Sequence, residues 1–199
     1  MLYSMSSKKE DTRKRILEAT WHLMEQHKGR GVAMSDIADK AGVSRQALYL
    51  HFKTRTELMV ATVQYVDEVK NLDKRLKKLD SADSGVELLE RYIEVWGNYI
   101  PEVYSLAKAL LNTRENDEAT AVAWNGCMST LQELCARVIE TLKKEGSLDS
   151  KWKKSEAVDM LWAVVSIHSW EQLVMECGWS NRRYVARMKV LLGSALVSD

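Results

Sequence analysis

The side chains best suited to chemistry lie close together, in the segment SRQALYLHFKTR at residues 44–55. Its adjacent Arg45 and Gln46 are residue types that read bases in a bidentate way, arginine at guanine and glutamine at adenine. The same segment holds donors that suit phosphate oxygens instead: Tyr49, His51, Lys53 and Arg55. This combination favours contact with a nucleic acid, with some side chains reading bases and others holding the backbone.

Two short helices joined by a turn are predicted to position these side chains, at about residues 33–52. Apolar residues recur at helical spacing in the first helix: Ile37, Ala38 and Ala41. Gly42 then suits a turn with a positive φ, and Ser44 is a favourable N-cap for the second helix. Leu48 and Phe52 would face inward, which leaves an outward or flanking surface with Arg45, Gln46, Tyr49 and Leu50. This is the layout of a helix-turn-helix, whose second helix enters the DNA major groove.

A further helix is expected ahead of this pair, from near Thr12 to about His27, after a polar tail at residues 1–10. Its inner face would hold Ile16, Ala19, Leu23 and Met24. Four basic residues lie around its start: Lys8, Lys9, Arg13 and Lys14. Two interpretations of them stay open, a contact with a DNA backbone and a solvated cluster of charges.

Charge is distributed unevenly along the 199 residues, although the net charge is only +1. Residues 1–58 carry 11 Lys and Arg against 7 Asp and Glu, whereas the remainder carries 18 against 21. A basic first part on a mildly acidic body suits a protein that touches phosphates with one end only.

Several classes of protein are not expected from this sequence. There is no G-x-S-x-G, H-E-x-x-H or glycine-rich phosphate loop, so we expect no enzyme, no catalytic residue and no cofactor. Three cysteines without a C-x-x-C pair argue against a disulfide scaffold or a metal site. The absence of a signal peptide and of a long apolar run predicts a cytoplasmic protein that does not span a membrane.

The rest of the chain is predicted to be helical, with no alternating strand pattern. One helix is expected at about residues 86–99, and Pro101 would open the next one. After a polar break at residues 114–117, a long helix runs to about Lys144. The segment from Ala157 to Cys177 is apolar nearly all round, and a last helix has an apolar stripe from Tyr184 to Leu196. The two C-terminal helices could form a four-helix bundle with a second copy, or close the core of one chain.

Residues 12–59 resemble the N-terminal domain of the TetR/AcrR family of bacterial transcriptional regulators. The matching segments are ILEAT and LM in the first helix, then DIADKAGVS, then LYLHFKTRTEL. The resemblance implies an all-α protein of about nine helices, with a three-helix DNA-binding domain at residues 1–58. Residues 59–199 would be a larger helical domain for effector binding and dimerisation. It also implies a homodimer whose heads bind successive major grooves of a palindromic operator in double-stranded DNA.

Matched to the family by position, the DNA-contacting residues would be Ser44, Arg45, Gln46, Tyr49 and His51. Arg55 stands where the family usually has a lysine that contacts phosphate. The sequence departs from the family before the second helix, where the usual hydroxyl residue gives way to Val32, Ala33 and Met34. Ser35 is the nearest substitute for this contact. Gln46 and Ala47 replace the common glycine or threonine early in the third helix, which changes the operator to be read.

The resemblance implies a small-molecule effector in the larger domain, and six of the seven tryptophans lie beyond residue 90. Aromatic walls with a few polar groups are typical of small-molecule sites. The candidate lining residues are Trp96, Tyr99, Tyr104, Trp124, Met128, Trp162, His168 and Trp170. Each of them also fits a purely structural place in the core. A lipophilic or a cationic ligand remains open, because neither sign of charge dominates these segments.

The sequence therefore predicts a ligand-responsive transcriptional regulator, a repressor that binds its operator as a homodimer and is released by a small-molecule effector. The alternative is an architectural or constitutive DNA-binding protein without an effector. The roughly 140 residues after the motif, and their aromatic content, favour the sensor.

Overall fold

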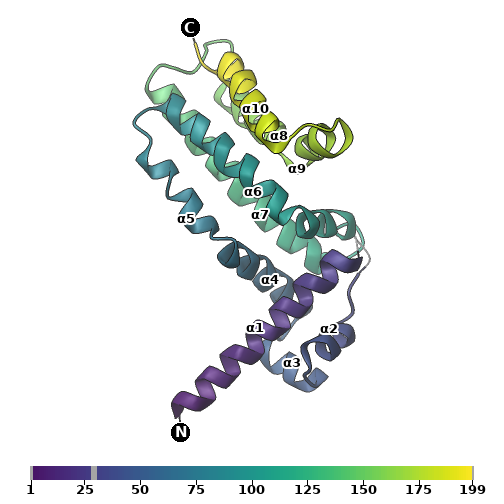
Figure 1. The fold of residues 1–199 in the computed structure, drawn as a ribbon. Helices are drawn as coiled ribbons and strands as arrows, with labels where there is room; N and C mark the ends of the chain where they lie inside the picture. The colour runs from purple at the N-terminus through teal and green to yellow at the C-terminus, as the bar shows by residue number, and fades with distance from the viewer. Residues whose placement is uncertain (1, 28–30, 199) are drawn as a thin grey trace. The chain divides into compact units, whose positions relative to one another are not determined.

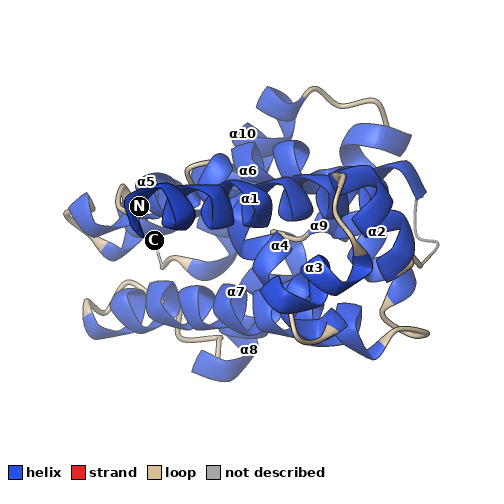
Figure 2. Ribbon diagram, turned by 90° about the horizontal axis from the view of Figure 1, so that it is seen from below, coloured by secondary structure: helices blue, strands red, loops and turns tan. Residues whose placement is uncertain are grey.

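A computed structural model describes residues 2–27 and 31–198; the side chains of residues 2–8, Lys8 among them, lie outside this description. The described residues form ten α-helices, one 3-10 turn and one π-helical turn, so the all-α prediction is confirmed (Figures 1 and 2). Their β-structure is limited to an isolated bridge between Leu148 and Val197. Within these residues, no helix combines the length and apolar character that a membrane span requires.

The helices follow one another along the chain with these bounds: α1 (Leu2–His27), α2 (Met34–Ala41), α3 (Arg45–His51), α4 (Arg55–Val69), α5 (Leu72–Leu76), α6 (Gly85–Thr113), α7 (Glu118–Lys144), α8 (Lys154–Val164), α9 (Ile167–Trp170) and α10 (Asn181–Leu196). The 3-10 turn is Leu79–Ser81, and the π-helical turn is Glu171–Glu176. Helix α1 begins about ten residues earlier than expected, so the assignment of residues 2–10 to a polar tail is wrong.

The chain divides into two compact units. The first contains Met1–Lys70 and Ser105–Gly126, and the second contains Asn71–Tyr104 and Cys127–Asp199. Helices α6 and α7 therefore contribute residues to both units. The functional division expected between residues 58 and 59 stays a prediction, and the compact unit that holds the first helices extends beyond it.

The turn between α2 and α3 has the geometry that the sequence predicts. Gly42 has φ 65°, and its N–H donates to the carbonyl of Asp39 at 3.1 Å. Ser44 caps α3, because its hydroxyl accepts a hydrogen bond from the N–H of Ala47 at 3.1 Å. In Figure 1 the two helices lie side by side next to α1, which is the arrangement of a helix-turn-helix.

One face of α3 is packed against the neighbouring helices through buried side chains. Leu48 and Phe52 have no exposed surface, and the same is true of Ile16 in α1 and Ile37 in α2. The guanidinium of Arg13 in α1 lies 4.3 Å from the centroid of the Phe52 ring. Because this face is fully used in packing, the opposite face of α3 is left to solvent.

An ion pair between Arg55 and Asp117 connects the beginnings of three helices in the first unit. Two guanidinium N–H groups, at Nε and Nη2, donate to the Asp117 Oδ2 at 2.9 and 2.6 Å. Arg55 Nη1 donates to the carbonyl of Val32, just ahead of α2, at 2.5 Å. The other carboxylate oxygen of Asp117 caps α7 by accepting from the N–H of Ala119 at 3.0 Å. The beginnings of α2, α4 and α7 are thus joined through two side chains.

Pro101 lies inside α6, so the predicted break after Tyr99 is wrong. A proline in a helix lacks the N–H for one backbone hydrogen bond. Residues on both sides of it are buried, among them Ile100 and Leu106. Burial of this stripe outweighs the lost bond, so the helix continues to Thr113.

The apolar segment at residues 157–177 is not one helix, contrary to expectation. Helix α8 ends at Val164, and Ser166 starts α9 with its hydroxyl accepting from the N–H of Ser169 at 3.2 Å. A serine that caps a new helix competes with continuation of the old one. The π-helical turn follows, with Cys177 as its C-cap and Gly178 at φ 70° directly after it.

We expect Gly42→Ala to destabilise the protein by about 1 kcal/mol, the conformational cost of a left-handed L-residue. A Cβ built at Gly42 meets no atom within 4 Å, so no clash adds to this cost. Gly126→Ala is the matched control, because Gly126 lies within α7 and is equally open. It should stabilise the protein by about 1 kcal/mol through helix propensity. Urea unfolding measures both, and an unchanged midpoint for Gly42→Ala would contradict the turn geometry.

We expect Asp117→Asn to lower the free energy of unfolding at neutral pH by about 1–2 kcal/mol, between the values for exposed and buried pairs. The Asp117 and Arg55 side chains are 17% and 26% exposed, and asparagine can still cap α7. Asp80→Asn is the control, because it removes the pair with Arg137 in which both side chains are largely exposed. It should cost no more than a few tenths of a kcal/mol.

The effect of Asp117→Asn should also depend on pH. Burial by itself raises the pKa of Asp117, but the hydrogen bonds and charge of Arg55 outweigh it and hold this pKa below its usual range. The pair therefore contributes its full stabilisation at pH values above the pKa of Asp117 in the unfolded chain, about 4. This stabilisation is lost as the pH falls through the lower pKa of the folded protein. In urea unfolding across this pH range, the free energies of unfolding of variant and wild type should converge at acid pH. A difference that stays constant with pH would contradict the ion-pair explanation.

Candidate DNA interface

The solvent face of α3 carries the side chains expected to read bases. Arg45, Gln46, Tyr49 and Leu50 are exposed, with Leu50 at 77%, while Leu48 between them is fully buried. The Arg45 guanidinium lies 6.0 Å from the centroid of the Tyr49 ring, one helical turn away. The exposed Leu50 adds an apolar group of the kind that can contact a thymine methyl. This face can make polar and apolar contacts to base edges in a major groove.

Ser44 and Ser35 lie next to this face with different environments. The Ser44 hydroxyl accepts a hydrogen bond as the cap of α3, and this holds its position. Ser35 is exposed in the first turn of α2, where its hydroxyl donates to the Asp36 carboxylate at 3.3 Å. The N-cap of α2 is Ala33, which has no side-chain acceptor. A phosphate contact by either serine stays a prediction.

Lys53 and Arg55 flank the cap of α4. Lys53 is exposed, and its backbone N–H donates to the Glu57 carboxylate at 2.9 Å. The hydroxyl of Thr54 accepts a hydrogen bond from the N–H of Glu57 at 3.1 Å and caps α4. The Arg55 guanidinium, in contrast, is half-buried and bound to Asp117 and Val32. A phosphate contact by Arg55 stays a prediction, and it would have to share or replace these partners.

An open groove of about 390 Å³ lies between α1 and α3. It is lined by Lys9, Glu10, Arg13, Leu50 and His51. Burial lowers the pKa of His51, and repulsion by the charges of Lys9 and Arg13 lowers it further. The groove brings together two basic residues of α1 with the last residue of α3, a pairing that sequence spacing alone does not reveal.

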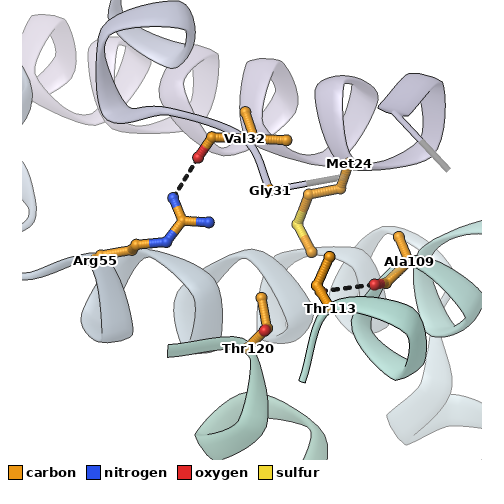
Figure 3. Close-up of a pocket in the computed structure, with 7 residues that line it drawn as sticks. All are labelled: Met24, Gly31, Val32, Arg55, Ala109, Thr113 and Thr120. Atoms are coloured by element: carbon orange, nitrogen blue, oxygen red, sulfur yellow. Dashed lines mark hydrogen bonds between the residues drawn. The ribbon is translucent and has the colours of Figure 1, made fainter. Parts of the chain in front are cut away.

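A much smaller cavity of about 10 Å³ lies beside the Arg55 side chain (Figure 3). It is lined by Met24, Gly31, Val32, Arg55, Ala109, Thr113 and Thr120. A space of this size has room for about one water molecule. It is therefore too small for an organic effector.

Part of the predicted effector lining is grouped in the second unit around Tyr104. The rings of Tyr104 and Trp170 have centroids 5.1 Å apart, and the Tyr104 hydroxyl donates to Glu171 at 2.5 Å. Burial and then the hydrogen bond to Glu171 raise the pKa of Tyr104 to about 12. The Trp170 indole N–H donates to Asn181 at 2.8 Å. Glu171 opens the π-helical turn, a form that is common at functional sites.

The other predicted lining residues are more scattered. Trp96 and Tyr99 are buried in the core of the second unit, with ring centroids 5.6 Å apart. Trp124 belongs to the first unit, where the Arg114 guanidinium lies 5.5 Å from its ring centroid. Met128 and Trp162 are half-buried, and His168 is exposed. An effector role for any of them stays a prediction.

Sequence reasoning missed a buried polar group in the same core. The Tyr92 hydroxyl lies 2.9 Å from the Cys135 Sγ, and both side chains are fully buried. Among the described residues, the buried Tyr184 hydroxyl and the Trp96 indole N–H have no hydrogen-bond partner. Helical spacing predicts aromatic core residues at these positions, but it does not reveal which polar atoms meet.

Comparison with known proteins gives a family match to the first part of the chain. Residues 16–62 match the family model of bacterial regulatory proteins of the tetR family. The nucleoid occlusion factor SlmA of Marinomonas sp. (strain MWYL1) is 30% identical over 82 residues, which is 41% of either chain. The chain therefore aligns with well under two thirds of this relative.

Solved structures share the fold over nearly the whole chain. A transcriptional regulator from Saccharomonospora viridis in complex with choline has a TM-score of 0.76 at 18% identity, covering 96% of this chain and all of that one. NalD of Pseudomonas aeruginosa, the secondary repressor of a multidrug efflux pump, has a TM-score of 0.75 at 20% identity, covering 96% and 98%. Residues 16–62 span the helix-turn-helix with parts of α1 and α4, so the match to bacterial regulatory proteins of the tetR family covers this segment, and the solved structures extend the likeness of fold to nearly the whole chain.

Proposed function

We propose that the protein is a DNA-binding transcriptional regulator that inserts α3 into the major groove. The observation that carries the proposal is the division of α3 into a buried face with Leu48 and an exposed face with Arg45, Gln46 and Tyr49. Bidentate contacts from Arg45 to guanine and from Gln46 to adenine would read sequence. His51 and Lys53 would hold phosphates and set the register of the helix on the duplex. Such a regulator works in the cytoplasm, where bacterial DNA lies.

The binding form is a homodimer joined through α8 and α10. These helices contact each other in the second unit and expose large apolar side chains: Met160 at 39%, Val190 at 60% and Leu191 at 51%. Exposed apolar groups of this size favour burial against a partner. A twofold dimer would read a palindrome, with half-sites about 34–36 Å apart when they are separated by one turn.

The output is repression, relieved by a small-molecule effector in the second unit. Tyr104, Trp170 and Glu171 offer aromatic surface beside a carboxylate, which suits a cationic organic molecule. The fold likeness to a choline-bound regulator and to the repressor NalD supports this choice. The ring contact and the carboxylate lie together in this group.

The effector would act on the motif through α6 and α7. Both helices contribute to the two compact units, and α7 is capped by the Asp117 that binds Arg55 of α4. A ligand that binds better when α7 is displaced would therefore shift α4 and the attached α3. Operator release then follows from the difference in ligand affinity between the two arrangements.

A second candidate is a DNA-binding protein without a small-molecule effector. The sequence match to a protein named nucleoid occlusion factor favours it, because that name describes no effector-controlled transcription. Both candidates share the DNA contacts, so selection of bound sequences from random duplex DNA does not distinguish them. Release of a selected operator by an added organic cation would favour the first.

Selection of bound sequences from random duplex DNA should enrich a palindrome for the wild-type protein. For Arg45→Ala we expect affinity for this site to fall by about 1–3 kcal/mol and preference at one base pair of each half-site to relax. The physical reason is the loss of a bidentate contact to a base edge. Enrichment without any preferred sequence would overturn the proposal.

Lys143→Ala is the matched control for Arg45→Ala. It removes one positive charge from an exposed position in the last turn of α7, in the second unit. Its base preference should equal that of wild type. If Arg45→Ala also kept the wild-type preference, α3 would not be the reading helix.

Leu191→Lys should convert the protein to a monomer in sedimentation velocity and weaken binding to the palindrome by about 100-fold, the avidity of two linked heads. A charge in the dimer contact would stay buried without a partner. Val122→Lys is the control, since Val122 is 45% exposed on the part of α7 in the first unit. A Leu191→Lys protein that stays dimeric would refute this choice of surface.

A further inference from the structure

We propose that the groove between α1 and α3 binds one phosphate of the DNA backbone, with Lys9 and Arg13 of α1 and His51 of α3 as its contacts. The inference rests on the proposed function and deepens it, because it adds a second helix to the DNA interface. The ligand is a phosphodiester of a duplex, which carries one negative charge and accepts hydrogen bonds from all three side chains.

The groove is adjacent to the face that would read bases. Leu50 lines it and is also the most exposed apolar residue of α3, so the groove opens at the edge of the recognition helix. Its volume of about 390 Å³ is ample for a phosphate group. A helix seated in the major groove is flanked by the phosphates of both strands, so a backbone group would lie beside this opening.

Arg13 is held in place before any ligand arrives. Its guanidinium lies 4.3 Å from the centroid of the Phe52 ring, and Phe52 itself is fully buried. Lys9 precedes Arg13 by four residues, so the two side chains share one face of α1. A stacked arginine and a flexible lysine on one face combine a fixed donor with an adaptable one.

The charges around His51 favour an anion. Lys9 and Arg13 are cationic, Glu10 on α1 is the acidic group of the lining, and the exposed Lys53 follows two residues along the chain. Burial and the two cations of α1 keep the pKa of His51 below its ordinary value in the free protein. A phosphate between these groups would screen this repulsion and attract a proton to His51.

Binding of DNA would therefore take up a proton at His51. Between the lower pKa of the free protein and the higher pKa of the complex, the complex holds more protons than its separate components. Affinity for DNA then falls as the pH rises through this interval. Phosphodiester groups do not titrate there, so the dependence would belong to the protein.

The test measures affinity for the selected palindrome and for an unrelated duplex, by fluorescence anisotropy at fixed ionic strength. For wild type we expect both affinities to fall about three- to tenfold between about pH 6 and about pH 8, near the histidine range. His51→Gln, which keeps a donor but does not titrate, should give a flat profile. A wild-type profile that is already flat, or that His51→Gln leaves unchanged, would overturn the role of His51.

Lys9→Ala tests the groove by another readout, because Arg13 also packs on Phe52 and its replacement could disturb the fold. The substitution should lower the affinity for both duplexes equally. It should also reduce the slope of log affinity against log salt concentration by about one. Lys143→Ala is the control, since it removes one positive charge from an exposed position on α7 that does not line the groove. Equal effects of the two substitutions would reject the site.

The two proposals fail in different ways. Selective binding to the palindrome with an unchanged salt slope in Lys9→Ala would overturn the groove and leave the regulator. Binding that is weakened by Lys9→Ala but shows no preferred sequence would support the groove and overturn the regulator. Binding to neither duplex at low salt would overturn both.

Discussion

The ion pair between Arg55 and Asp117 is the constraint on which the first compact unit depends. It joins the first residue of α4 to the cap of α7, and a third donor of Arg55 binds the carbonyl of Val32 ahead of α2. Removing one partner of this half-buried pair is expected to cost about 1–2 kcal/mol, which is less than the cost for a fully buried pair. Within this unit, the helix-turn-helix is therefore connected to the turn between α6 and α7.

This connection offers a physical route by which the proposed effector could change the position of α3. The compact unit that contains α3 also contains Ser105–Gly126, the end of α6 and the beginning of α7. A displacement of these segments would act on Arg55 directly, because its guanidinium donates hydrogen bonds to Asp117 ahead of α7 and to Val32 ahead of α2. The family resemblance implies a phosphate contact for the same residue. The Asp117 carboxylate and a DNA phosphate would therefore compete for the Arg55 guanidinium. Phosphate and carboxylate offer similar oxygen pairs to a guanidinium.

Local signals in the sequence predicted the motif well. Gly42, Ser44 and Thr54 act through bonds and dihedral angles within four residues, so their roles follow from the sequence alone. The helix boundaries in the body were less predictable. Pro101 was expected to start a helix and instead lies inside one, and Ser166 interrupts a segment expected to be continuous. Long-range burial outweighs a single lost hydrogen bond in the first case, and local capping outweighs an apolar pattern in the second.

By itself, the sequence determined an all-α chain with a helix-turn-helix and the exposed side chains of α3. These features depend on periodicity, capping and the twofold choice between a buried and a solvated helix face. Only the tertiary structure decided which distant residues meet: Asp117 with Arg55, Lys9 and Arg13 with His51, and Tyr104 with Trp170 and Glu171. Such contacts depend on how the helices pack, and side-chain type and spacing do not encode a partner many residues away.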